Sequence, residues 1–226
     1  MALAETSRVV VFDFDGTLAD TWRDLQTALN RTLADTGLPP VEGPQVRAWI
    51  GDGALKLLAN ALPENERAPE RLEGHYERFR THYDRCCLDT TELYPGISQC
   101  LESLSHDRLA VLSNKPARFL DRIIDGLGIK GVFGAVLGGD TLPVRKPDPA
   151  LITGVIERLG VRRPCEIWMI GDSAVDVETG RAAGARTIGC GWGLRGREEL
   201  RAAGVEFLLE SPSEIADTIR RGRPLR

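Results

Sequence analysis

The chain has 226 residues, 42% of them hydrophobic, and a formal net charge of −4 from 29 Lys and Arg against 33 Asp and Glu. A chain of this size can bury a sizeable core as one domain, or as one domain with a smaller insert. The acidic balance argues against a nucleic-acid partner. Residues 1–7 lack a basic leader, no apolar run is long enough to cross a membrane, and the five cysteines form no Cys-x-x-Cys pair, so we expect a cytoplasmic protein with reduced thiols.

The first predicted strand, over 9–12, ends in the most informative feature of the sequence. It reads Val-Val-Val-Phe, a β-branched and aromatic run that is typical of a strand buried on both faces of a parallel sheet. Asp13 and Asp15 follow it directly, and Gly16 then turns the chain. Beyond the carboxyl end of such a strand, two acids can share a divalent cation or divide the roles of nucleophile and acid. A helix N-cap would explain one of these aspartates but not both.

Helical patterns fill the next part of the chain. Apolar residues recur at helical spacing over 22–33, and Gly37 and the prolines after it end that helix. Further helices are expected over 54–62 and 68–85, and no strand candidate occurs before Leu109. We therefore expect residues 18–91 to form an inserted, all-helical cap domain, between core segments 1–17 and 92–226.

From Leu109 onward, strand and helix patterns alternate. This alternation predicts an α/β fold whose core is a doubly wound, Rossmann-like parallel sheet. Helices separate the strands, for example over 119–127 and 150–159. The expected strands are 109–112, 135–137, 167–170, 187–190 and 207–209.

Polar residues follow the carboxyl ends of the expected strands. Each has an ordinary explanation when taken alone, as a turn residue, a surface charge or a helix cap. Their joint placement indicates one shared site, because the carboxyl ends of parallel strands meet at one edge of the sheet. The set is Ser113, Asn114 and Lys115 after one strand, Lys146 before a proline-started helix, and Asp172, Ser173 and Asp176 after another strand.

Four motifs in this order resemble the haloacid dehalogenase superfamily of phosphotransferases. They are Asp-x-Asp-Gly-Thr at 13–17, Ser-Asn-Lys-Pro at 113–116, Lys-Pro-Asp-Pro at 146–149 and Gly-Asp-Ser-x-x-Asp at 171–176. The match covers nearly the whole chain, and capped members carry their helical cap where the insertion lies here. The resemblance implies a Mg²⁺-dependent hydrolase of a small-molecule phosphate monoester, acting as a monomer or homodimer without nucleic-acid or membrane partners.

The resemblance also implies a role for each motif residue. Asp13 would be the nucleophile that forms an aspartyl phosphate, and Asp15 would protonate the leaving oxygen and then activate water. A phosphate dianion near Asp13 meets repulsion of about 4 kcal/mol per charge pair at ~4 Å, so attack needs compensating cations. Lys146 would supply one charge and Mg²⁺ the others. The implied metal ligands are Asp13, the Asp15 carbonyl and Asp172. Asp176 and Ser173 would contact the groups around the metal without binding it. The implied phosphate ligands are Thr17, Ser113 and the Asn114 amide.

Substrate choice is expected to lie in the cap. Trp49-Ile50-Gly51-Asp52-Gly53-Ala54 resembles the substrate loop of the phosphoglycolate phosphatase branch, which has Asn in place of Asp52. We therefore expect hydrolysis of 2-phosphoglycolate to glycolate and phosphate. The glycines Gly51 and Gly53 free backbone amides for an anion, and a substrate carboxylate would be neutralised by nearby cations. These cations are Arg47, Lys56 and Lys115.

Other functions remain open at this point. The substrate could be a nucleotide, pyrophosphate or a sugar phosphate, and a sugar phosphomutase would keep both acids. Dehalogenation is disfavoured, because a halide leaves without the proton that Asp15 would supply. A remote alternative is an oxidoreductase, since 191–196 matches the dinucleotide pattern Gly-x-Gly-x-x-Gly, although it lies near the chain's end.

Overall fold

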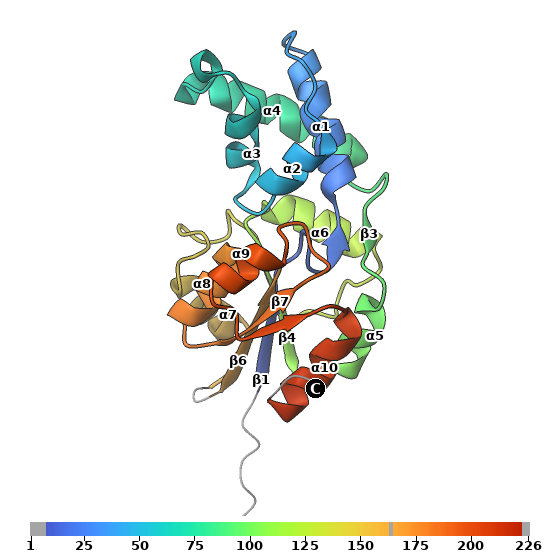
Figure 1. Ribbon diagram of the computed structural model, residues 1–226, viewed down its shortest axis with the longest axis vertical. Coiled ribbons are helices and arrows are strands. Elements are labelled where there is room, and N and C mark those ends of the chain that lie inside the picture. Colours follow the sequence, from blue (N-terminus) through green and yellow to red (C-terminus); the bar gives the residue numbers. More distant parts are fainter. Residues whose placement is uncertain (1–7, 163–164, 223–226) are drawn as a thin grey trace, which may run out of the picture.

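The computed structural model describes residues 8–162 and 165–222. Among these residues, six parallel strands form the central sheet in the order β5-β4-β1-β6-β7-β8 (Figure 1). The chain winds from β1 outward to β5, returns to β6 and winds outward to β8, which confirms the doubly wound sheet. The strands are β1 (Arg8–Phe12), β4 (Arg108–Leu112), β5 (Ala135–Leu137), β6 (Glu166–Gly171), β7 (Arg186–Cys190) and β8 (Phe207–Leu209).

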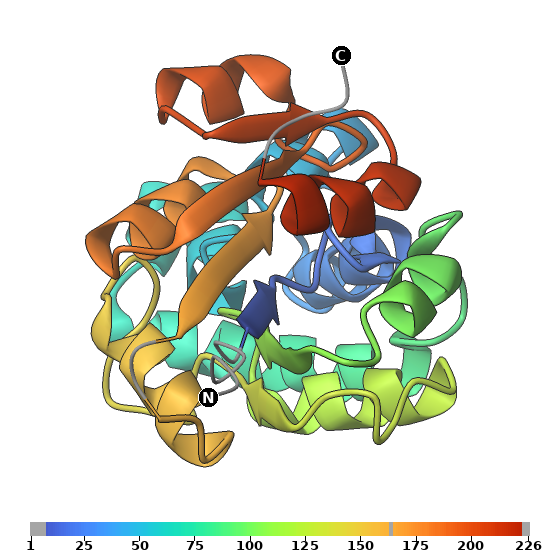
Figure 2. The ribbon, with the colours of Figure 1, turned by 90° about the horizontal axis from the view of Figure 1, so that it is seen from below.

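Both faces of the sheet are buried under helices, as Figure 2 shows. Alternate residues of β1 point to opposite faces: Val10 and Phe12 join the apolar cluster of α5, α6 and α10, whereas Val9 and Val11 join that of α7. This explains the unbroken apolar run of the first strand. The core helices are α5 (Ile97–Ser103), α6 (Ala117–Gly126), α7 (Ala150–Arg158), α8 (Ala174–Ala182), α9 (Arg197–Ala202) and α10 (Ile215–Arg221).

A helical cap sits over the carboxyl ends of the strands (Figure 1). Its longest helices, α1 and α4, pack against each other through apolar residues that include Leu29 and Phe79. The inserted all-helical cap is thus confirmed, whereas its exact limits at 18 and 91 stay a prediction. No helix of the described residues is long and apolar enough to cross a bilayer. The cap helices are α1 (Trp22–Ala34), α2 (Gly43–Trp49), α3 (Ala54–Ala61) and α4 (Pro69–Cys86).

Two short strands connect the cap to the core. They are β2 (Ala19–Asp20) and β3 (Glu92–Leu93), which pair antiparallel. The prediction of no strand between the first strand and Leu109 is therefore wrong. A strand of two residues has too few positions to show an alternating pattern, and its partner lies more than 70 residues away in the sequence.

The buried carboxylate of Asp24 joins the two connections. This residue lies in the first turn of α1, and its oxygens accept hydrogen bonds from the backbone amides of Thr90 and Thr91 at 2.9–3.1 Å. The hydroxyls of both threonines also donate to it, at 2.7 and 2.8 Å. Asp24 therefore fixes the segment that leaves the cap against the helix that enters it.

Candidate active site

The predicted catalytic residues lie at the centre of the sheet edge that faces the cap. Asp13 follows β1, Ser113 follows β4 and Asp172 follows β6, and these three strands are neighbours. The winding direction of the sheet reverses between them, which is the place where open α/β sheets bind ligands. All three side chains are buried.

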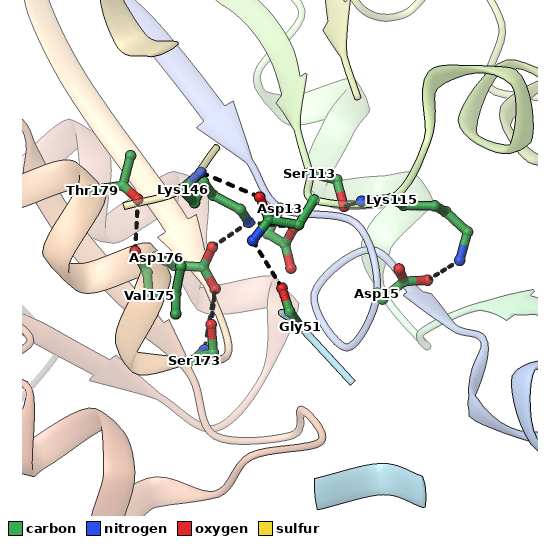
Figure 3. A network of polar contacts seen from close by, with 11 residues as sticks. Asp13, Asp15, Gly51, Ser113, Lys115, Lys146, Ser173, Val175, Asp176 and Thr179 are labelled. Carbon is green, nitrogen blue, oxygen red and sulfur yellow. Dashed lines mark hydrogen bonds and ion pairs between the residues drawn. The ribbon is translucent and has the colours of Figure 1, made fainter. Parts of the chain in front are cut away.

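Lys146 bridges two of the aspartates. Its Nζ lies 2.7 Å from Oδ1 of Asp13 and 2.6 Å from Oδ1 of Asp176, and all three groups are buried (Figure 3). The other oxygen of Asp176 accepts from the amide and the hydroxyl of Ser173, which caps α8. The pair Ser173 and Asp176 is therefore a helix cap and a support for Lys146 at once.

Negative charge exceeds positive charge in this cluster. Oxygens of Asp13, Asp172 and Asp176 lie within 4.8 Å of one another, and Lys146 is the cation bonded to two of them. Burial raises the pKa of Asp13 to about 7, and burial with the neighbouring acids raises the pKa of Asp172 well above its ordinary value. Burial lowers the pKa of Lys146, but the two carboxylates beside it raise that pKa overall. An all-oxygen cluster with excess negative charge fits a hard divalent cation.

The Asp15 carboxylate belongs to a separate set of contacts. Its Oδ1 accepts from the hydroxyl of Thr21 at 2.5 Å and from Nζ of Lys115 at 2.7 Å. The structure thus brings Lys115, 100 residues away in the sequence, to the proposed proton donor. Thr21 was not predicted, because a threonine before a helix has an ordinary role as a cap and gives no separate signal.

Of the three residues predicted to bind phosphate, only Ser113 lines the cavity. Asp13 lines the same cavity. Asn114 donates from Nδ2 to the carbonyl of Gly51 at 3.0 Å and accepts at Oδ1 from the Lys146 amide at 3.2 Å, so it links the cap to the catalytic lysine. Thr17 is buried outside the cavity lining, and its hydroxyl has no hydrogen-bond partner within the described part of the chain.

The cavity lies between cap and core and has a volume of about 40 Å³. A single water needs roughly 10–15 Å³ of such space, so only a small group fits beside the reacting atoms. Cap residues such as Leu57 and Phe79 give it an apolar wall, whereas Asp13, Asp15 and Ser113 form its polar end. Among the described residues that line it, Lys115 is the one cation.

The predicted substrate loop reaches the cavity only in part. Gly51 and Gly53 line it, whereas Asp52 does not. Arg47 is exposed, with its guanidinium 5.6 Å from the centre of the Trp22 ring, and Lys56 is also exposed. The structure therefore does not bring Arg47 or Lys56 into the cavity.

The glycine-rich segment 191–196 contacts the site from β7. The amide of Leu194 donates to Oδ2 of Asp172 at 2.6 Å, and a Cβ on Gly193 would lie 2.2 Å from Cβ of Asp172. Close approach to an aspartate thus explains this glycine. Arg195 extends to the cap, where it donates to the backbone carbonyl of Ala48. Sequence reasoning missed Leu194 and Arg195, because a backbone donor and a contact across 147 residues leave no local pattern.

A doubly wound sheet, a helical cap and a buried carboxylate–lysine cluster between them define a capped α/β phosphohydrolase. The family model of haloacid dehalogenase-like hydrolases matches residues 10–190, and the chain belongs to that family. It is a phosphoric monoester hydrolase.

Several relatives of this chain are named phosphoglycolate phosphatase. The chain is 33% identical over 225 residues to a phosphoglycolate phosphatase of Psychrobacter arcticus, with 96% of this chain and 97% of that one covered. It is 35% identical over 210 residues to a phosphoglycolate phosphatase of Aquifex aeolicus, covering 92% and 94%. A crystal structure of a predicted phosphoglycolate phosphatase from Haemophilus somnus is similar with a TM-score of 0.86 and 27% identity, covering 94% of this chain and 98% of that one.

Proposed function

We propose that this protein is a Mg²⁺-dependent phosphatase that hydrolyses 2-phosphoglycolate to glycolate and phosphate through an aspartyl-phosphate intermediate. The observation that carries the proposal is the bridge of Lys146 between Asp13 and Asp176, beside Asp172 and at the end of a small cavity. The names of the relatives support the choice of substrate.

The metal site would consist of the Asp13 carboxylate, the Asp15 backbone carbonyl and Asp172. Asp176 would orient Lys146 without binding the metal, because Lys146 and Ser173 already bond to its two oxygens. When bound, Mg²⁺ supplies positive charge that offsets the phosphate dianion and the buried carboxylates.

Asp13 would begin the reaction. Lys146 holds its Oδ1, which leaves Oδ2 to attack phosphorus while the bond from phosphorus to the ester oxygen breaks. The ammonium of Lys146 stabilises the charge that develops on the transferred group. Ser113 lines the same end of the cavity and would hold a phosphate oxygen.

Asp15 would move the protons. It would give a proton to the departing ester oxygen and later take one from the water that hydrolyses the aspartyl phosphate. The contacts from Thr21 and Lys115 both use Oδ1, so Oδ2 is left for this transfer. Asp13 would thus act as the nucleophile beside Lys146, and Asp15 would act as the acid and base beside Lys115.

Cavity size supports a small leaving group. Space of about 40 Å³ holds only a few heavy atoms, so a nucleoside or hexose would have to displace the cap much further than a two-carbon acid. The substrate must enter by cap opening, since apolar side chains of the cap close one wall.

A panel of phosphate monoesters tests the proposal. We expect kcat/KM in the presence of Mg²⁺ to be highest for 2-phosphoglycolate among 2-phosphoglycolate, ethyl phosphate, a nucleoside monophosphate, pyrophosphate and glucose 6-phosphate. A higher value for another substrate would overturn the substrate assignment. Undiminished turnover after chelation would overturn the metal assignment.

A further inference from the structure

The Tyr83 hydroxyl stands apart from the other polar groups of the cavity. Tyr83 lies on α4 and is 1% exposed, and its hydroxyl has no hydrogen-bond partner among the described residues. No other buried and unpaired side-chain polar atom of the described chain belongs to a residue that lines this cavity. A buried hydroxyl without a partner is costly, so a group that enters the cavity and accepts its hydrogen bond is expected.

Aromatic neighbours hold the Tyr83 ring at the junction of cap and core. Phe79 stacks on it with ring centres 5.6 Å apart, and Phe119 of the core helix α6 meets it edge-on at 4.9 Å. A ring fixed on two sides keeps its hydroxyl in one place. Tyr83 is therefore preorganised to bind a group that lies between cap and core.

The ammonium of Lys115 lies over the face of the same ring. Its Nζ is 4.9 Å from the centre of the Tyr83 ring and 2.7 Å from Oδ1 of Asp15. An ammonium carries three N–H donors, so Lys115 can keep its bond to Asp15 and donate to a further oxygen. As the one cation among the described lining residues, it is where an anionic leaving group would find opposite charge.

We propose that the hydroxyl of Tyr83 and Nζ of Lys115 together form the subsite that binds the carboxylate of the leaving group. This inference rests on the proposed function and names the residues that select its substrate. A carboxylate entering an otherwise apolar wall needs both charge and hydrogen-bond donors, and these two groups supply them. A neutral alkyl leaving group would leave the Tyr83 hydroxyl unpaired.

The subsite differs in kind from the phosphate site. Asp13 and Lys146 act on the transferred phosphate and therefore serve every monoester. Tyr83 and Lys115 would contact only the part of the substrate that distinguishes one monoester from another. Loss of either group should thus change the ratio of kcat/KM between an acidic and a neutral substrate.

Paired variants test the subsite. We would measure kcat/KM for 2-phosphoglycolate and for ethyl phosphate, which has no carboxylate, in the wild type, Tyr83→Phe and Lys115→Met. We expect each variant to lower the preference for 2-phosphoglycolate by about 10- to 100-fold, as is typical for the loss of a hydrogen bond to a charged group. Tyr76→Phe, on the same helix outside the cavity, and the exposed Lys130→Met are the matched controls and should keep the preference.

Binding of the product glycolate gives a readout that does not depend on turnover. We expect its competitive inhibition constant to rise at least tenfold in Tyr83→Phe, while that of inorganic phosphate stays within about threefold. The variant should melt no lower than the wild type, because it removes an unpaired buried hydroxyl.

The proposed function and the carboxylate subsite are contradicted by different results. A wild type that does not prefer 2-phosphoglycolate to ethyl phosphate contradicts the proposed function itself. If the wild type has that preference and both Tyr83→Phe and Lys115→Met keep it, the subsite is overturned and the function stands. The same holds if the wild type has the preference and the inhibition constant of glycolate is unchanged in Tyr83→Phe.

Discussion

The guanidinium of Arg195 donates to the backbone carbonyl of Ala48 at 2.5 Å and thereby joins the core to the end of cap helix α2. A second bond reaches the carbonyl of Ile50 at 3.3 Å, and Glu199 orients the guanidinium from 2.9 Å. The residue before it, Leu194, donates to Asp172. Two consecutive residues of one loop therefore contact the acidic cluster and the closed cap.

Arg195→Ala should favour the open cap. Removing the hydrogen bonds of a charged donor costs the closed form about 2 kcal/mol, so we expect kcat/KM to fall roughly 10- to 30-fold. Amide hydrogen exchange in α2 should accelerate. Arg197→Ala is the matched control, because Arg197 pairs with Glu210 and has no hydrogen bond to the cap. Equal behaviour of the two variants would show that Arg195 does not hold the cap.

Asp13→Asn should abolish turnover without unfolding the protein. The amide is nearly isosteric with the carboxylate but cannot attack phosphorus, so we expect kcat to fall by at least about 10³-fold. In the wild type, rapid quench with labelled substrate should trap a base-labile phosphate on Asp13. The exposed Asp121→Asn is the control. Label on Ser113 instead of Asp13 would contradict the assignment.

Stabilisation by Mg²⁺ should depend on pH. Burial raises the pKa of Asp13 from 3.8 to about 7, so the metal-free folded protein keeps a proton there that the unfolded chain loses near pH 4. The stability from this group is fully present below pH 3.8 and is lost as the pH rises through about 7. Bound Mg²⁺ favours the ionised form. We therefore expect a larger Mg²⁺-induced rise in Tm near pH 8 than near pH 5.5, and equal rises would contradict this account.

Asp172→Asn tests whether Asp172 is a ligand of the metal. This substitution removes a carboxyl group whose ionisation is opposed by burial and by Asp13 and Asp176, so we expect the metal-free protein to be at least as stable as the wild type near pH 8. The rise in Tm with Mg²⁺ should disappear. Thermal melts with and without Mg²⁺ measure both effects, with Asp121→Asn as control. A variant that keeps the full Mg²⁺ response would show that Asp172 is not a ligand.

Asp24→Asn should weaken the connection between the cap and the core. Amide and hydroxyl donors of Thr90 and Thr91 surround both carboxylate oxygens, so an Asn amide group would face donors. We expect a loss of about 2–4 kcal/mol in the free energy of unfolding, or roughly 5–10 °C in Tm. Urea unfolding checks the first number. The exposed Asp35→Asn, at the other end of α1, should change stability by less than about 1 kcal/mol.

The placement of the polar motifs was predictable because it is local. A strand that is buried on both faces consists of consecutive apolar residues. The aspartates that follow β1 and β6 therefore mark the ends of these strands in the sequence alone. Parallel strands then bring such ends to one edge of the sheet. There, Lys146 contacts Asp13, and an oxygen of Asp172 lies within 4.8 Å of an oxygen of Asp13. Their roles in catalysis stay predictions until the variants are measured.

The cap residues show where sequence reasoning stops. Arg47 and Lys56 lie within five residues of the loop at 51–53, yet both are exposed outside the cavity, since the direction of a side chain depends on how its helix docks. Tyr83 occupies the apolar face of α4, where an aromatic residue is expected to be ordinary core. No periodicity distinguishes a buried hydroxyl that lines a cavity from one that does not.

The sequence by itself determined the α/β class, the helical insertion and the acidic ends of the strands, because each follows from hydrophobic patterns within a few residues. The contacts of Lys115 with Asp15, Tyr83 with Phe119 and Arg195 with Ala48 were decided only by the tertiary structure. Each joins residues at least 36 positions apart whose approach depends on the packing of the cap against the core. Packing is a property of whole surfaces, and no local run of residues encodes it.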